Sequence, residues 1–192
     1  MRLSISNIGW VSESDEQIYK IMKKLDFRGL EIAPTRIFPE SPYDKSEDAK
    51  KWSESLKKEY GFCVPSMQSI WYGRQEKIFH SPEDREALTE YTKKAIDFAA
   101  AIGCGNLVFG CPRNRNIEGE YDPDVATDFF RTIGDYAASR GTTIGMEANP
   151  PIYNTNFIND TVSAIELIEQ VGSDGFKLNL DLGTVIQNRE NL

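Results

Sequence analysis

The chain has 192 residues, of which 40% are hydrophobic and 11% aromatic, enough for the core of one globular domain. Its formal net charge of -8 excludes a broad nucleic-acid or anionic-membrane surface, because such surfaces need clustered Lys and Arg. No apolar run approaches the roughly 20 residues of a membrane span, and the start lacks the apolar core of a signal peptide. We therefore expect a cytoplasmic protein without membrane or nucleic-acid partners.

Cysteine and histidine offer little metal-binding capacity. Cys63, Cys104 and Cys111 are odd in number and lack C-x-x-C spacing, which argues against a disulfide framework and against a thiolate zinc site. His80 is the only histidine, and it lies beside a predicted helix start, where a surface position is expected. Any metal site would therefore have to be built from oxygen ligands.

Short apolar or β-branched runs alternate with longer amphipathic stretches along the whole chain. This is the pattern of successive βα units around a parallel sheet. Six strands are predicted, over residues 2–8, 29–33, 63–68, 106–110, 143–147 and 177–181.

The predicted helices carry their own start and stop signals. Ser14 is followed three residues later by Gln17, the spacing of a capping box. A cap residue followed by proline opens the two longest stretches, and glycine marks helix ends. The further signals are Ser81 with Pro82, Asp122 with Pro123, Asp160 or Thr161, and the glycines 61, 103, 141 and 172.

Six βα units could form either an open doubly wound sheet or most of a (βα)8 barrel. The first strand runs into "SISNIGWVSES" without a G-x-G-x-x-G phosphate-binding loop, which argues against the common nucleotide-binding sheet. Polar residues follow almost every strand, and in a barrel those ends converge on one mouth. We therefore predict an incomplete TIM-barrel-type α/β fold with about six βα units in a single domain, residues 1–192.

Two carboxylates end consecutive strands. Glu147 follows "TTIGM", and Asp181 ends the next strand, one βα unit later. Adjacent strands lie roughly 4.8 Å apart, so two such carboxylates can share one divalent cation, Mn²⁺, Mg²⁺, Co²⁺ or Zn²⁺. The alternative is that each acid is a loop cap or a salt-bridge partner.

Three further residues suggest a site for a hydroxyl-rich ligand. Glu31 lies inside an apolar strand, so it needs either a function or a buried partner such as an arginine. Gln68 offers an amide to substrate hydroxyls, and Trp71, with Tyr72 beside it, could pack on a sugar face. Loop packing is the alternative role for these aromatic residues.

The segment "FGCPRNRN" is a local basic exception. Arg113 and Arg115 are two residues apart, so in an extended loop both would face one phosphate or carboxylate. Solvated or salt-bridged arginines are the alternative. Asn149, two residues after Glu147, completes the predicted substrate-binding set.

The segments "GLEIAP", "PSMQSIWYG", "NLVFGCPRNR", "GMEANPP" and "LNLDLGT" resemble the xylose-isomerase-like TIM barrel superfamily, and specifically its sugar phosphate isomerase/epimerase members. The resemblance covers essentially the whole chain as strand order. It implies that Glu147 and Asp181 are metal ligands and that Glu147 is also a catalytic acid/base. In that superfamily a His from the seventh strand and a Glu from the eighth complete the site.

The resemblance also implies that this chain lacks the last two βα units. Half of the metal site would then be missing, so weak or absent metal binding is expected, and open sheet edges would favour homo-oligomers. Thr184 stands where the superfamily's DNA-repair endonucleases place a histidine, which argues against that activity. The leading hypothesis is a metal-assisted sugar or sugar phosphate isomerase/epimerase. The rivals are a non-catalytic, truncated barrel that binds a ligand or partner, and a hydrolase or lyase on the same fold.

Overall fold

The computed structural model describes residues 3–191 and contains six short strands in one parallel series. Strands β1 and β2 pair with each other, and β3 to β6 form a four-stranded sheet. Isolated parallel bridges from Gly29 to Cys63 and from Ile32 to Met67 join the two sheets. The strands are β1 (Ser4–Ser6), β2 (Gly29–Glu31), β3 (Ser66–Met67), β4 (Asn106–Phe109), β5 (Thr143–Met146) and β6 (Phe176–Leu178).

Strand order identifies the architecture. Each strand is parallel to the strand before it in the chain, with no reversal of order between β1 and β6. A doubly wound sheet would contain such a reversal. The fold is therefore an incomplete (βα)8 barrel, as the sequence predicted.

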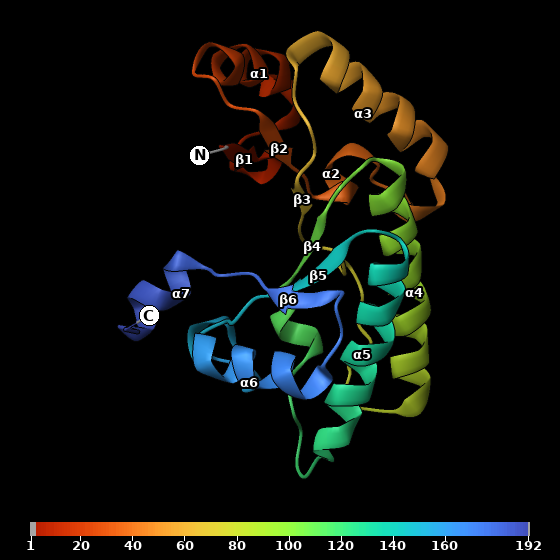
Figure 1. Ribbon diagram of the computed structural model, residues 1–192, viewed down its shortest axis with the longest axis vertical. Coiled ribbons are helices and arrows are strands. Elements are labelled where there is room, and N and C mark those ends of the chain that lie inside the picture. The colour runs from red at the N-terminus through yellow and green to blue at the C-terminus, as the bar shows by residue number, and fades with distance from the viewer. Residues whose placement is uncertain (1–2, 192) are drawn as a thin grey trace.

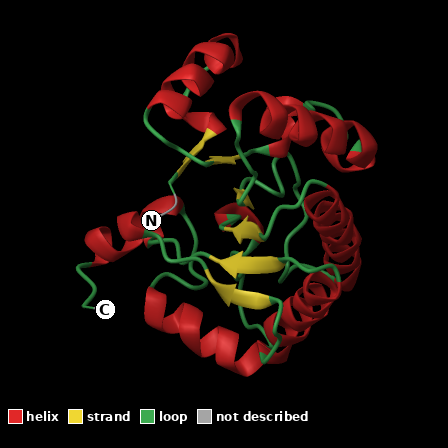
Figure 2. Cartoon of the chain, turned by 45° about the horizontal axis from the view of Figure 1, so that its top comes forward, coloured by secondary structure: helices red, strands yellow, loops and turns green. Residues whose placement is uncertain are grey.

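Helices cover the outside of the strands (Figure 2). β1 and α7, the first and last elements, lie on the same side of the molecule (Figure 1). Within residues 3–191, no helix has both the length and the apolarity to cross a membrane. The helices are α1 (Asp15–Lys24), α2 (Pro34–Ile37), α3 (Ser46–Tyr60), α4 (Pro82–Ala101), α5 (Pro123–Ser139), α6 (Thr161–Val171) and α7 (Leu182–Asn188).

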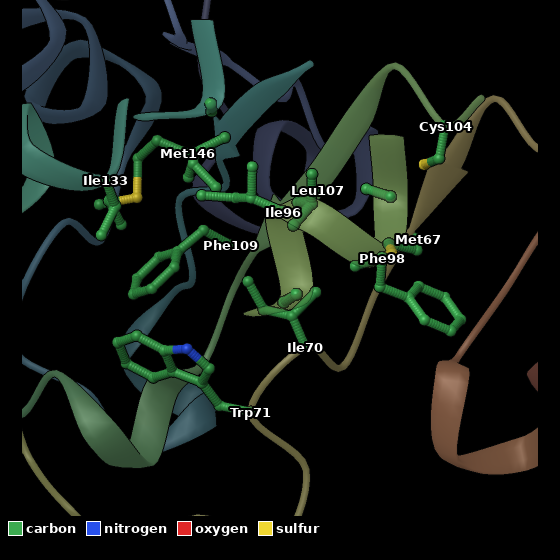
Figure 3. Close-up of a cluster of buried hydrophobic side chains, with 14 of the residues drawn as sticks. Met67, Ile70, Trp71, Ile96, Phe98, Cys104, Leu107, Phe109, Ile133 and Met146 are labelled. Carbon is green, nitrogen blue, oxygen red and sulfur yellow. The ribbon is translucent and has the colours of Figure 1, made fainter. Parts of the chain in front are cut away.

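The hydrophobic core lies between the strands and the helices. Outward-facing strand residues such as Met67, Leu107 and Met146 are buried against helical residues such as Ile96 and Ile133 (Figure 3). Because side chains alternate along a strand, the opposite face points into the barrel.

That inner face is polar. A side chain at Gly145 would meet Asn106 Oδ1 at 2.5 Å and Asn179 Cβ at 3.1 Å, so residues of β4, β5 and the segment after β6 converge there. The inner positions are only partly buried. They include Ser6, Glu31, Ser66, Gln68, Asn106, Thr143, Glu147 and Asn179.

Most helix-start predictions are confirmed. The side chains of Ser81, Asp122 and Asp160 each accept a backbone N–H at the start of α4, α5 and α6, respectively. The prediction of a capping box at Ser14 is wrong. Ser14 closes a 3-10 turn and makes no side-chain cap, and Asp15 instead receives hydrogen bonds from Trp10 and Arg36.

Several predicted strands are longer than the observed ones. The first ends at Ser6, because Asn7 turns inward and its Oδ1 accepts the N–H of Ala33 at 2.9 Å. The last ends at Leu178, so Asp181 lies beyond the strand and caps α7. The sequence reasoning did not predict α7.

Candidate functional site

A cavity of about 440 Å³ lies at the carboxyl ends of the strands. It brings together five of the residues singled out in the sequence, which come from β2 and from the segments after β3, β5 and β6. These residues are Glu31, Gln68, Glu147, Asn149 and Asp181.

Glu147 follows β5 directly and is held by two amides. Asn149 Nδ2 donates to its Oε1 at 3.0 Å, and Asn179 Nδ2 donates to its Oε2 at 3.2 Å. Burial raises the pKa of the Glu147 carboxyl above 4.5, the Asn149 hydrogen bond opposes this, and the charge of Asp181 adds to the rise. A carboxyl whose pKa is raised in this way holds a proton more readily than an exposed carboxyl does, which suits it to acid/base catalysis.

Asp181 caps a helix, which is one of the alternative roles predicted for it from the sequence. Its Oδ1 accepts from Gly183 N at 3.2 Å, and its Oδ2 accepts from Thr184 N at 2.8 Å and from Thr184 Oγ1 at 2.9 Å. Thr184 Oγ1 is in turn 2.8 Å from Ala148 O, next to Glu147 in the chain. Asp181 is thus an N-cap that also faces the cavity.

Glu31 has neutral partners. Ser66 Oγ donates to Glu31 Oε2 at 2.6 Å, and Gln68 Nε2 donates to Glu31 Oε1 at 2.9 Å. The same Gln68 nitrogen lies 2.7 Å from Ser6 Oγ. The alternative of a buried arginine partner is therefore wrong, and the Gln68 amide nitrogen is already engaged by the protein.

Trp71 is in the core and does not present its face to the cavity. The side chain is 3% exposed, its Nε1 donates to Thr92 Oγ1 at 2.8 Å, and its ring meets Phe109 edge-on (Figure 3). The interpretation of Trp71 as a sugar platform is therefore wrong, and the alternative, loop packing, is also inexact because the ring packs in the core. Its neighbour Tyr72 is exposed.

Arg113 and Arg115 do not face one anion. A 3-10 turn, Pro112–Asn114, replaces the expected extended loop, so the two side chains diverge. Arg115 is 0% exposed and donates from Nη1 to Glu147 O at 2.9 Å and from Nη2 to Ile158 O at 3.4 Å. Burial lowers its pKa to about 10. Arg115 therefore positions the Glu147 backbone, whereas Arg113 is exposed.

Sequence reasoning missed residues that shape the site. Asn179 and Ser66 bind the two glutamates, and each lies on the inner face of its strand series. Gly110 provides space, because a Cβ there would lie 3.1 Å from Glu147 Oε1. The alternation of side chains could have revealed Asn179, which is two residues before Asp181.

Glu147 and Asp181 offer carboxylate oxygens, the type of ligand that suits a hard divalent cation. Carboxylate oxygens are preferred by Mg²⁺ and Mn²⁺, and Mg²⁺ is commonly held by one or two carboxylates with water and substrate oxygens. Among residues 3–191, however, no cluster of three or more His, Cys, Asp or Glu side chains could hold a metal. Two carboxylates are the donors that this part of the chain provides.

A family model for the xylose isomerase-like TIM barrel matches residues 19–191. The chain belongs to this family. No curated protein matches the sequence.

Solved structures share the family's barrel. A 3-keto-D-glucoside 4-epimerase from E. coli superposes with a TM-score of 0.75 at 19% identity, over 100% of this chain and 72% of that one. A D-psicose 3-epimerase from Clostridium cellulolyticum, with D-tagatose, superposes with a TM-score of 0.79 at 15% identity. The match covers 100% of this chain and 67% of that one. A sugar phosphate isomerase/epimerase from Parabacteroides distasonis superposes with a TM-score of 0.63 at 16% identity. The match covers 99% of this chain and 68% of that one. This chain therefore spans about two thirds of the length of these solved structures.

Proposed function

We propose that the chain carries the site of a metal-assisted sugar or sugar phosphate isomerase/epimerase. The observation that supports this most is Glu147, a partly buried carboxyl with a raised pKa beside a second carboxylate, in a polar cavity at the barrel mouth. Proton transfer next to a carbonyl needs such a group.

In this proposal each residue has a definite task. Glu147 takes a proton from the carbon next to the substrate carbonyl and returns it, and Asn149 and Asn179 keep its two oxygens in place. Glu31 and Gln68 bind substrate hydroxyls. A divalent cation held by Glu147 and Asp181 would polarise the carbonyl and the adjacent hydroxyl.

The proposal assigns acid/base catalysis to a single residue, Glu147. The number of acid/base groups limits which reaction the chain's own residues can complete. Moving a proton between adjacent carbons on one face of the substrate needs a single carboxyl and gives an isomerisation. Epimerisation requires a second acid on the opposite face. Glu147 alone therefore supports isomerisation.

The solved structures named above support the substrate class. Their names describe epimerases and isomerases of sugars, and one was solved with D-tagatose. Since a barrel hosts many reactions, this likeness adds to the site argument without replacing it.

A second candidate is a barrel that binds a ligand or partner without catalysis. It is favoured by the two-carboxylate donor set of residues 3–191. The two candidates differ in whether a substrate carbon exchanges its proton.

Calorimetric titration of the chain with Mn²⁺ tests the metal site, with Glu147→Gln and Asp181→Asn as variants. Glu169→Gln, an exposed acid on α6, is the matched control. We expect binding in the wild type and the control and loss of binding in both site variants. Unchanged binding in either site variant would contradict the assignment.

Proton exchange tests catalysis. The wild type with Mn²⁺ in D₂O should incorporate deuterium next to the carbonyl of a ketose or ketose phosphate, detected by NMR, and Glu147→Gln should not. Metal binding without any exchange across a ketose panel would favour the non-catalytic candidate.

A further inference from the structure

A second cavity, of about 780 Å³, adjoins the first, and both are lined by Ser69, Cys111 and Pro112. The two differ in charge. The first is lined by three acidic residues and no basic one, as described above. The second is lined by three basic residues and no acidic one, Arg74, Lys77 and Arg113. In a chain of net charge -8, this separation suggests a ligand with one anionic end.

The two loops that carry these cations are tied to each other. Asn114 Nδ2 donates to Arg74 O at 3.2 Å and to Glu76 O at 2.8 Å, and Ile78 N donates to Asn114 O at 2.9 Å. The loop after β3 therefore cannot move independently of the loop after β4. Their cations are held around one space before a ligand arrives.

The cations differ in how free they are to bind. Arg113 is exposed and forms no ion pair within residues 3–191. Lys77 pairs with Glu118, whose side chain is 69% exposed, so solvent weakens that pair. Arg74 pairs with Glu76 and lies 4.6 Å from the Tyr91 ring centroid. Arg113 and Lys77 can therefore turn to an anion, and Arg74 adds fixed positive charge.

The boundary between the cavities is conformationally strained. Ser69 and Cys111 have φ of 54° and 44°, in the left-handed region that residues other than glycine rarely occupy. Such strain costs energy and concentrates at binding sites. Here it lies at the two residues that begin the loops and separate the acidic cavity from the basic one.

We propose that the second cavity binds the phosphate of a phosphorylated sugar whose carbonyl end lies at Glu147. The inference rests on the proposed function for the sugar end, and on Arg74, Lys77 and Arg113 for the phosphate end. A phosphate group carries close to two negative charges and several acceptor oxygens, so it matches three cations better than a single carboxylate does.

The test is calorimetry on the full chain without metal. The probes are D-fructose 6-phosphate, D-fructose, D-gluconate and inorganic phosphate. The variants are Arg113→Gln and Lys77→Gln, with Lys20→Gln, an exposed lysine of α1, as the matched control. Circular dichroism verifies that each variant is folded.

We expect D-fructose 6-phosphate to bind at least about tenfold more tightly than D-fructose, and each site variant to lose about tenfold, the scale of one hydrogen bond to a charged group. The affinity for inorganic phosphate should fall in parallel in the site variants, while the affinities of the control variant stay at the wild-type values. Equal affinity for the two fructoses, or site variants that match the control, would overturn the proposal.

D-Gluconate distinguishes the two sources of negative charge. Binding of D-gluconate as tight as that of D-fructose 6-phosphate would overturn the assignment to phosphate. Because no metal or turnover is involved, phosphate binding that is lost in Arg113→Gln would stand even if the Mn²⁺ and deuterium experiments failed.

Discussion

The environment of Glu147 links its chemistry to stability. Burial raises its pKa above 4.5, so the folded protein favours the protonated form more than the unfolded chain does. The stability that this group contributes is therefore fully present below the unfolded pKa and is lost as pH rises through the raised folded pKa.

Replacing Glu147 with Gln should remove this pH dependence. We expect the difference in unfolding free energy, variant minus wild type, to become more positive as pH rises from about 4 to 7. Urea unfolding at a series of pH values measures it. The slope of this difference is the readout, because the amide also changes the hydrogen bonds with Asn149 and Asn179 by a pH-independent amount. A slope of zero or of opposite sign would contradict the pKa direction.

A substitution at Gly110 tests whether Glu147 needs the space beside its carboxylate. A Cβ at Gly110 would lie 3.1 Å from Glu147 Oε1, closer than an ordinary contact, and the carboxylate would have to move. We expect Gly110→Ala to weaken Mn²⁺ binding by about tenfold while changing unfolding free energy by about 1 kcal/mol or less, because a flexible side chain can yield.

The matched control is Gly105→Ala, whose Cβ would be 3.9 Å from Pro65 O, an ordinary contact. It should leave Mn²⁺ affinity unchanged. Equal Mn²⁺ affinities for Gly110→Ala and the control would show that the position of the carboxylate does not matter for metal binding.

At the scale of elements, Arg115 joins three segments. It comes from the loop after β4 and donates to the carbonyls of Glu147, after β5, and Ile158, before α6. Replacing it with Met would leave the partly buried Glu147 carbonyl without this donor, whereas Ile158 O would keep its bond from Asn149 N. We expect a loss of about 2–4 kcal/mol in unfolding free energy, measured by urea denaturation.

Arg113→Gln, two residues away and exposed, should change stability by no more than about 0.5 kcal/mol. Similar losses in the two variants would show that burial of Arg115 does not govern its contribution.

The sequence revealed the series of strands and the carboxylates at their ends, because strand alternation and βα order are local patterns. Glu31, Gln68, Glu147, Asn149 and Asp181 do meet in one cavity. The roles of Trp71 and Arg115 depended on which way a loop turns. The 3-10 turn at Pro112–Asn114 and the packing of Trp71 on Phe109 are tertiary outcomes that residue type alone does not specify.

At the scale of the molecule, β1 and β6 are the outermost strands and do not pair with each other within residues 3–191. Apolar residues are exposed on both of these strands, including Ile5 on β1 and Leu178 on β6. Unpaired strand edges with exposed apolar side chains favour association.

We therefore expect concentration-dependent association, measured by size-exclusion chromatography with light scattering. Ile5→Lys and Leu178→Lys should each shift the equilibrium toward monomer by placing a charge at an edge. The control Ile152→Lys changes an exposed apolar residue away from the strands, in the turn Pro151–Tyr153, and should leave association unchanged. A wild type that stays monomeric at all concentrations would contradict the expectation.

The polar inner face of the barrel has an evolutionary consequence. The residues that stabilise the fold lie outside the strands, and those that would contact a ligand lie inside, so alternate positions of one strand serve the two purposes. Selection can therefore change Gln68 or Asn179 with little effect on the packing of Met67 or Phe176. We expect a library randomised at the inner positions to contain a large fraction of folded members, and hence the fold to acquire new specificities through sequences that remain viable at each step.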